Sequence, residues 1–212
     1  EYYPDAQLKA IVPVIGGKNS GIQYNYNLAG KIIDSTYHIM GYLDGMVREY
    51  YPTGELKSIV RYIDGDQHGQ YNDYLVDGTK YSDEFYEFGE QISNTTYTLN
   101  NNPLRINSYY NDNMRTLQLL APDGKTPLIK LYYADNTLFK ISCAQKGGKM
   151  MDYENVGTEE QTYKAYYPNG ALGGVISYKK GVLNGVRSIY YPNGQAYETA
   201  SFSEGNYEGP VT

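Results

Sequence analysis

Apolar and polar residues alternate over short stretches of this chain, and turn residues separate the stretches. Residues 186–191 and 195–202 are examples, both rich in Tyr, Ile, Val and Thr. β-Favouring runs of this kind, divided by turns at regular spacing, predict strands joined in antiparallel hairpins. The chain lacks an apolar stripe of helical period with caps. The pattern therefore predicts an all-β fold, an extended antiparallel meander with essentially no helix.

The stretches repeat with a period of 24 residues. This interval separates tyrosines in two regions of the chain, namely Tyr2, Tyr26, Tyr50 and Tyr74, and then Tyr166 and Tyr190. A fixed period of this size indicates one small supersecondary unit copied along the chain, each copy packed against its neighbours. We predict that each copy is one β-hairpin and that the copies form a single-layer twisted sheet.

The clearest copies continue from a tyrosine pair into Pro-x-Gly, which is a turn signal. Pro sets φ for the first turn position, and Gly supplies the positive φ of a later one. We therefore expect left-handed backbone at Gly54 and Gly194. Asn102 and Asn136 fall at the same place in the register, and Asn is the best substitute for Gly in that conformation.

A second turn signal recurs in antiphase with the first. Asp44-Gly45, Asp64-Gly65 and Asn184-Gly185 are dipeptides typical of tight hairpin turns. We expect the chain to reverse direction at these dipeptides. Each copy would then have two kinds of turn, one at each end of its strands.

The period is interrupted in the middle of the chain. Thr98 replaces the tyrosine, and the next matches, Tyr132 and Tyr166, each follow after 34 residues. The ten extra residues predict one more strand and turn in each interval. Turn signals at 122–124 and 146–148 favour a continuing meander.

We interpret residues 1–212 as one repeat array. Its regular repeats occupy residues 1–97 and 166–212, and residues 98–165 form a diverged middle section. The alternative is that residues 100–160 are an inserted module.

The tyrosine-pair motif resembles the bacterial variant of the MORN repeat. The resemblance rests on the Tyr-Tyr-Pro-Asn-Gly pentads and the apolar residue after them, and the best copies are residues 50–73, 166–189 and 190–212. It implies an array of β-hairpins that serves as a scaffold or interaction surface, and some members carry an antitoxin label. The chain has no Trp and lacks the dense glycine spacing of the eukaryotic repeats. We therefore do not expect the membrane-lipid association of those relatives here.

Tyrosine dominates the apolar composition, with 27 Tyr against four Phe and no Trp. A single-layer sheet encloses no dry core, so its faces suit side chains with an apolar body and a polar tip. We interpret the tyrosines as mainly structural. The alternative is an aromatic platform for a sugar or a peptide.

Negative charge is concentrated in the first half of the chain. Residues 1–100 hold seven Lys and Arg against 14 Asp and Glu, while residues 101–212 hold 11 against 10. Nucleic acid and anionic membrane are disfavoured as partners, because both attract a basic stripe. The charge distribution favours another protein as partner, one that is basic.

The sequence does not fix the cellular compartment. The chain starts inside a repeat at Glu1 without Met, so we expect a trimmed targeting segment, and the Tyr- and Asn-rich composition leans towards a bacterial cell envelope or secreted protein. Cys143 is the one cysteine, which excludes an internal disulfide and leaves the compartment open.

We expect no catalysis, no cofactor and no metal site. The histidines, His38 and His68, both lie in or beside hairpin segments. Residues 64–69 imitate the start of a calcium loop, but Leu75 stands where that loop needs a bidentate Glu. The residue types present assemble neither a nucleophile with its base nor a metal-ligand set.

The strongest candidate binding site is the acidic and aromatic segment at residues 83–90. Its candidate binding residues are Asp83, Glu84, Tyr86, Glu87 and Glu90. On a strand, Asp83 and Glu87 share a face, and Glu84 lines up with Tyr86 on the other. Carboxylates mixed with aromatic rings suit a basic peptide. The alternative is that these charges keep a sheet edge from pairing with other chains.

We expect the protein to be a non-catalytic repeat scaffold for protein–protein interaction, and the resemblance adds an antitoxin or immunity role. An extended sheet offers a wide surface and unpaired terminal strands for association. The alternative is a cell-surface module that binds carbohydrate or the envelope through exposed tyrosines.

Overall fold

The computed structural model describes residues 1–111, 113–154, 156 and 159–209, and these form strands and turns with no helix. The chain divides into two compact units, unit 1 at Glu1–Asn101 and unit 2 at Asn102–Thr212. The predicted all-β antiparallel meander is confirmed. The units differ in whether their strands form one layer or two.

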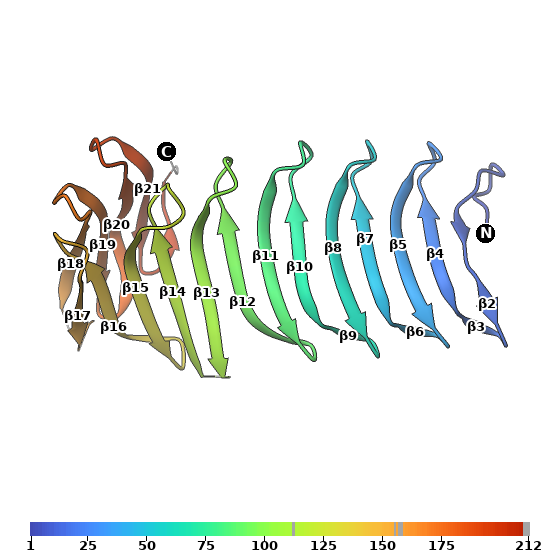
Figure 1. Ribbon diagram of the computed structural model, residues 1–212, viewed down its shortest axis with the longest axis horizontal. Helices are drawn as coiled ribbons and strands as arrows, with labels where there is room; N and C mark the ends of the chain where they lie inside the picture. Colours follow the sequence, from blue (N-terminus) through green and yellow to red (C-terminus); the bar gives the residue numbers. More distant parts are fainter. Residues whose placement is uncertain (112, 155, 157–158, 210–212) are drawn as a thin grey trace. The chain divides into compact units, whose positions relative to one another are not determined.

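Unit 1 is a single antiparallel layer. Its strands are β1 (Ala10–Ile11), β2 (Val14–Ile15), β3 (Lys18–Asn19), β4 (Gly21–Tyr26), β5 (Ile32–Ile39), β6 (Tyr42–Leu43), β7 (Gly45–Tyr50), β8 (Leu56–Ile63), β9 (Asp66–Gln67), β10 (Gly69–Tyr74), β11 (Lys80–Glu87) and β12 (Glu90–Tyr97). The longer strands lie side by side in chain order, and β2–β3, β6 and β9 form hairpin tips (Figure 1). Among the described residues of unit 1, Ala10 and Val60 are the buried apolar side chains. The layer therefore has no dry core.

Four-residue turns join the strands of unit 1 at one end of each hairpin, the upper end in Figure 1. In the turn at residues 51–54, the backbone N–H of Gly54 donates to the carbonyl of Tyr51 at 2.8 Å. The φ angle of Gly54 is 110°, and that of Gly194 in the equivalent turn of unit 2 is 87°. The predicted left-handed backbone of both glycines is confirmed.

The same turn recurs through the middle of the chain. Its first residues are Tyr3, Asn27, Tyr51, Leu75, Thr98, Ala121, Gln145, Tyr167 and Tyr191, at intervals of 22 to 24 residues. The predicted interval of 34 residues is therefore wrong, because Tyr132 lies inside a strand and the period continues past it. Asn101, with φ of 58°, takes the left-handed position in place of Asn102, since its turn begins one residue early. Asn136 has positive φ as predicted, at 61°, but in the other kind of turn.

Two-residue turns close the opposite ends of the hairpins, with positive φ at both residues as type I′ turns require. They are Gly16-Gly17, Met40-Gly41, Asp64-Gly65, Phe88-Gly89, Asp135-Asn136, Lys180-Gly181 and Glu204-Gly205. The predicted reversal at Asp64-Gly65 is confirmed, whereas those at Asp44-Gly45 and Asn184-Gly185 are wrong. Gly185 instead lies within a strand, opposite a register shift between Ile176 and Tyr178, so its positive φ accommodates a bulge.

In three of the tyrosine pairs, the second tyrosine links neighbouring repeats. Its hydroxyl donates to a backbone carbonyl 23 residues later, that of the first tyrosine in the next repeat. The three bonds run from Tyr3 to Tyr26 at 2.7 Å, from Tyr51 to Tyr74 at 2.8 Å and from Tyr167 to Tyr190 at 2.6 Å. These tyrosines thus have a structural role. The hydrogen bond between repeats explains why the repeat has tyrosine and not phenylalanine at this position.

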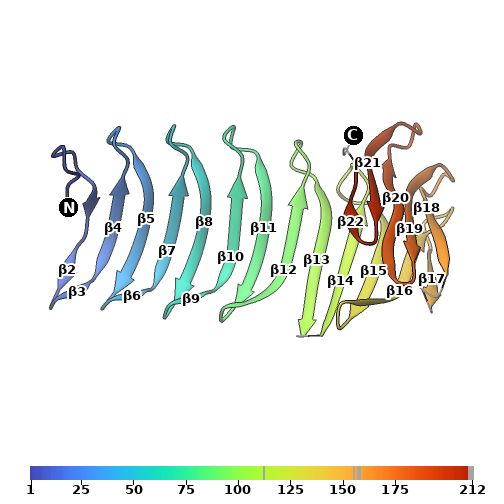
Figure 2. The ribbon, with the colours of Figure 1, turned by 180° about the vertical axis from the view of Figure 1, so that it is seen from behind.

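Unit 2 contains two antiparallel sheets, each with its strands in chain order. The first has β13 (Pro103–Asn111), β14 (Met114–Leu120), β15 (Pro127–Ala134), β16 (Thr137–Ala144) and β17 (Met150–Glu154), and the second has β18 (Glu160–Tyr166), β19 (Leu172–Lys179), β20 (Val182–Tyr190), β21 (Ala196–Ser203) and β22 (Asn206–Tyr207). Strands β15 and β16 pack against β18, and β15 also packs against β19. Figure 2 shows the second sheet in front of β14–β16.

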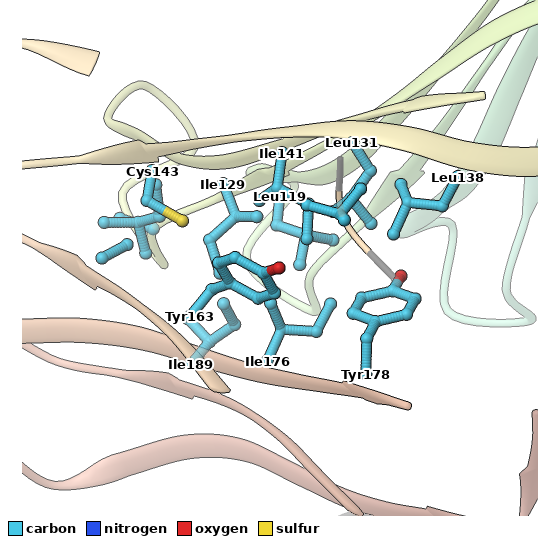
Figure 3. Packing of buried hydrophobic residues seen from close by; sticks show 14 of the residues in the cluster. Leu119, Ile129, Leu131, Leu138, Ile141, Cys143, Tyr163, Ile176, Tyr178 and Ile189 are labelled. Carbon is cyan, nitrogen blue, oxygen red and sulfur yellow. The ribbon is translucent and has the colours of Figure 1, made fainter. Parts of the chain in front are cut away.

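A dry core fills the space between the two sheets of unit 2 (Figure 3). The first sheet contributes Leu119, Leu128, Ile129, Leu131, Leu138, Ile141 and Cys143, and the second contributes Tyr163, Ala165, Ile176, Tyr178 and Ile189. Full burial of a large aliphatic side chain stabilises the fold by about 1.5–3 kcal/mol. The predicted single layer thus describes unit 1, and in unit 2 the structure adds a second layer.

Two further contacts hold the sheets of unit 2 together. A Cβ at Gly173 in β19 would lie 2.6 Å from Cδ2 of Leu128, so glycine permits the close approach of the sheets. Glu198 in β21 is 5% exposed and accepts hydrogen bonds from Arg105 in β13 and, at 2.8 Å, from Nη2 of Arg187. The two guanidinium groups compensate the desolvation of this carboxylate.

Cys143 is part of the core and inaccessible to solvent. Burial raises the pKa of its thiol from 9.0 to about 12, and burial also raises the pKa of Tyr167 from 10.0 to about 12. The reactive thiolate form is therefore suppressed at neutral pH.

Replacing Gly54 or Gly194 with Val should lower the free energy of unfolding by about 1 kcal/mol or more, because a β-branched residue is strained at positive φ. A Cβ at either glycine would meet nothing within 4 Å, so the loss would come from backbone strain and not from a clash. Thr53→Val, in the same turn as Gly54, is the control and should cost less than about 0.5 kcal/mol. Unchanged urea midpoints in both glycine variants would contradict the turn assignment.

Removing the hydroxyl of Tyr51 or Tyr167 by substitution with Phe should cost about 1 kcal/mol, the net value of one hydrogen bond. Tyr191→Phe is a matched control, because Tyr191 has the same place in its repeat and donates to no described residue. Chemical unfolding of the three variants tests this. Equal losses in all three would show that the link between repeats contributes nothing.

The protein should lose stability at alkaline pH. The folded chain holds the protons of Cys143 and Tyr167 more tightly than the unfolded chain, so the free energy of unfolding is constant below about pH 9 and falls towards pH 12. Urea unfolding across this range measures the slope. Cys143→Ala should make the slope shallower between about pH 9 and 10, where the unfolded thiol ionises first. An unaltered slope in that variant would contradict the assignment.

Candidate functional site

The acidic segment at residues 83–90 occupies the end of β11, a two-residue turn and the start of β12. The Asp83 carboxylate is hydrogen-bonded to neighbouring side chains of the sheet. Its Oδ2 accepts from the hydroxyl of Tyr97 at 2.6 Å, and from Nζ of Lys80 and Nε2 of Gln70, both at 3.2 Å. Desolvation and the Asp83 carboxylate raise the pKa of Tyr97 above its usual value. Asp83 thus has three partners within unit 1.

Glu84 lies on the opposite face of β11 and is also engaged. Its carboxylate accepts hydrogen bonds from the hydroxyl of Tyr86, from Nε2 of Gln91 at 2.7 Å and from Nδ2 of Asn94 at 3.5 Å. The pairing of Glu84 with Tyr86 on one face agrees with strand alternation. Tyr86 therefore orients this carboxylate.

Glu87 and Glu90 are exposed and stand directly opposite each other across the hairpin. They flank the Phe88-Gly89 turn, where the Phe88 side chain is 74% exposed and its ring lies 5.1 Å from that of His68. Two like charges in cross-strand register repel each other. A cationic group from a partner would relieve this repulsion.

The five candidate residues therefore do not form one cluster. Asp83 and Glu84 point to opposite faces, Tyr86 accompanies Glu84, and Glu87 and Glu90 lie at the hairpin tip. Binding by any of them stays a prediction.

A longer acidic row runs across the face that carries Glu84. Cross-strand pairing brings residues far apart in the chain into one line, in the order Asn25, Asp34, Glu49, Ser58, Asp73, Ser82 and Thr96. We call the side of unit 1 with Asp34, Glu49, Asp73 and Glu84 the acidic face.

Local polar contacts orient the carboxylates of the acidic face. Asp34 accepts from Nδ2 of Asn25 at 2.6 Å, and Asp73 accepts from the hydroxyl of Tyr71 at 2.7 Å. Asp34 and Glu49 are directly opposite each other. The exposed Lys57 pairs with Glu49 at 3.1 Å, and exposed pairs of this kind contribute little energy.

Sequence reasoning did not identify Asp34, Glu49 and Asp73 as a group. A short window misses them because 15 residues separate the first two and 24 the last two. The 24-residue period would have placed Glu49 and Asp73 at equivalent positions, but the pairing with Asp34 requires the register of the sheet.

The described residues contain no group of three or more His, Cys, Asp or Glu side chains placed to hold a metal ion. Asp64 lies in a two-residue turn and Asp66 in β9, so the calcium-like segment forms a hairpin tip. The Nδ1 atoms of His38 and His68 are buried without a hydrogen-bond partner among the described residues. In the part of the chain that the structure covers, no helix has the length and apolar character of a membrane span.

Comparison with known proteins supports the repeat assignment. The family model described as MORN repeat variant matches residues 43–64 and 183–204. The first match spans the β7–β8 hairpin and the second the β20–β21 hairpin, each with its four-residue turn after a tyrosine pair. A search of curated proteins finds no match. All-β folds of this repeat are generally non-catalytic modules, and the family suggests a repeat scaffold for binding. This chain thus carries repeats of the MORN repeat variant family, in unit 1 and in unit 2.

Proposed function

We propose that this protein is a non-catalytic scaffold that binds a basic protein through the acidic face of unit 1. The proposal rests on the row formed by Asp34 in β5, Glu49 in β7 and Asp73 in β10. In this row Ser58 of β8 lies between Glu49 and Asp73. Glu84 extends the same face on β11. Four carboxylates on one side of a sheet give a directional negative field, which favours a cationic surface as partner.

The single layer makes this face suitable for recognition. Its side chains are mostly half-buried, and hydrogen bonds from Asn25, Tyr71 and Tyr86 orient three of the carboxylates. A partner would therefore meet charges that are already positioned. Preorganised groups lose less conformational entropy on binding than free surface side chains.

The hairpin tip at residues 87–90 is a second acidic element, at the end of the strands β11 and β12. Glu87 and Glu90 repel each other across the strand pair, and Phe88 between them is 74% exposed. A basic side chain of the partner would neutralise the carboxylates, while its apolar stem covers the Phe88 ring.

An antitoxin or immunity role is the narrower form of this proposal. In that form the partner is a basic toxin, and the scaffold neutralises it by covering its surface. The support is the family resemblance together with the net charge of unit 1, whose seven Lys and Arg face 14 Asp and Glu.

Charge removal at Glu49 of the acidic face and at the hairpin tip should slow association with the partner. The full chain carrying Glu49→Gln, Glu87→Gln and Glu90→Gln changes three exposed residues, so the fold is not at risk. A matched control carries Glu154→Gln, Glu160→Gln and Glu204→Gln, three exposed carboxylates of unit 2 with the same total charge change. We expect the association rate of the first variant to fall about tenfold at low salt and that of the control to change less than about twofold.

The partner is first captured with the wild-type chain and identified by mass spectrometry, and its association rate is then measured at several salt concentrations. The difference between the variants should vanish at about 0.5 M salt, where charges are screened over a few Å. An acidic partner, rates insensitive to salt or equal rates for both variants would contradict the proposal.

A further inference from the structure

The opposite face of unit 1 contains a hollow with a different chemistry. Its volume is about 290 Å³, and the side chains around it include Tyr24, Ser35, Tyr37, Met46, Arg48 and Tyr50. They come from the neighbouring strands β4, β5 and β7. We call this site the Arg48 hollow. Its size is at the lower end of small-molecule pockets, which suits a ligand of one ring.

Four polar groups of the hollow have no partner among the residues that the structure describes. Arg48 forms no ion pair or hydrogen bond with any described residue, and the same holds for the hydroxyls of Tyr24, Tyr37 and Tyr50. Other tyrosines, such as Tyr51 and Tyr97, donate their hydroxyls to protein acceptors. The hollow therefore gathers four groups whose hydrogen-bonding capacity is left for solvent or a ligand.

The shape of the hollow follows from two small residues. Ser35 is 5% exposed and lies between Tyr24 and Arg48 in cross-strand register, and one repeat later Ile59 takes its place beside Arg48. The small Ser35 side chain thus leaves space that Ile59 fills in the next repeat. A Cβ at Gly45 would lie 2.7 Å from Cδ1 of Tyr37, so the glycine allows the Tyr37 ring to rest on the backbone at the rim.

We propose that the Arg48 hollow binds the carboxylate of an acidic sugar, a hexuronic acid residue of a polysaccharide. The planar guanidinium of Arg48 matches a carboxylate in a two-bond geometry. The hydroxyls of Tyr24, Tyr37 and Tyr50 both donate and accept, which complements sugar hydroxyl groups, and their rings offer apolar surface to the sugar ring.

The charge of unit 1 selects a singly charged ligand. Seven Lys and Arg against 14 Asp and Glu give residues 1–100 a net charge of −7, which repels a dianionic phosphate more than a carboxylate. An acidic peptide would satisfy Arg48, but each of its backbone groups either donates or accepts, whereas a sugar hydroxyl does both, as the three tyrosine hydroxyls do. The combination of one cation with three hydroxyls therefore favours the sugar.

Calorimetric titration of the full chain with methyl galacturonide, which carries a single carboxylate, tests this, with neutral methyl galactoside and the singly charged peptide unit acetyl-glutamate-methylamide as comparison ligands. We expect binding of the uronate and at least about tenfold weaker binding of the other two, because one charge-assisted contact is worth about that factor. Equal binding of the neutral sugar, tighter binding of the peptide or no binding of the uronate would overturn the proposal.

Two substitutions and a control locate the site. Arg48→Gln should weaken uronate binding about tenfold or more. Ser35→Ile should abolish it by filling the hollow, with the fold retained because the next repeat carries Ile59 at this position. Arg61→Gln removes an exposed cation from the same face, outside the hollow, and should change affinity less than about twofold. Loss of binding in Arg61→Gln equal to that in Arg48→Gln would show a diffuse charge effect and contradict the site.

Discussion

The hydrogen-bond ladder between hairpins is the interaction on which unit 1 depends, because a single layer encloses no dry core. Its strands are closed at both ends by turns that contain a residue at positive φ, and the twist of the two-residue turns matches that of the strands. The hydroxyl of Tyr51 adds a bond from one repeat to the carbonyl of Tyr74 in the next. Local geometry repeated at a fixed period thus holds together a layer that hydrophobic burial does little to stabilise.

Unit 2 uses the same hairpins and a different source of stability. Its two sheets bury side chains such as Leu128, Ile141 and Ile176 between them. Gly173 permits the close approach of the sheets, and the buried Glu198 is compensated by two arginines. We therefore regard unit 2 as the part with a hydrophobic core and unit 1 as the part with two open faces for binding.

The two faces of unit 1 differ in charge because strand alternation sorts neighbouring residues to opposite sides. Arg48 and Glu49 are adjacent in the chain, yet Arg48 lines the hollow and Glu49 belongs to the acidic row. One layer can therefore carry a cationic site for a sugar carboxylate and an acidic face for a basic protein without either neutralising the other. The two proposals use different residues, and the four carboxylates of the acidic face lie opposite the Arg48 hollow.

The sequence alone determined the hairpin repeat, the positive φ of Gly54 and Gly194 and the all-β class, because turn chemistry and alternation act between residues close in the chain. It also indicated that Asp83 and Glu84 lie on opposite faces. Only the tertiary structure decided that residues 119–143 form one side of a two-layer core, and that Asp34, Glu49 and Asp73 form a row on the face opposite the Arg48 hollow. Those arrangements depend on cross-strand register and on the packing of one sheet against another, which join residues distant in sequence.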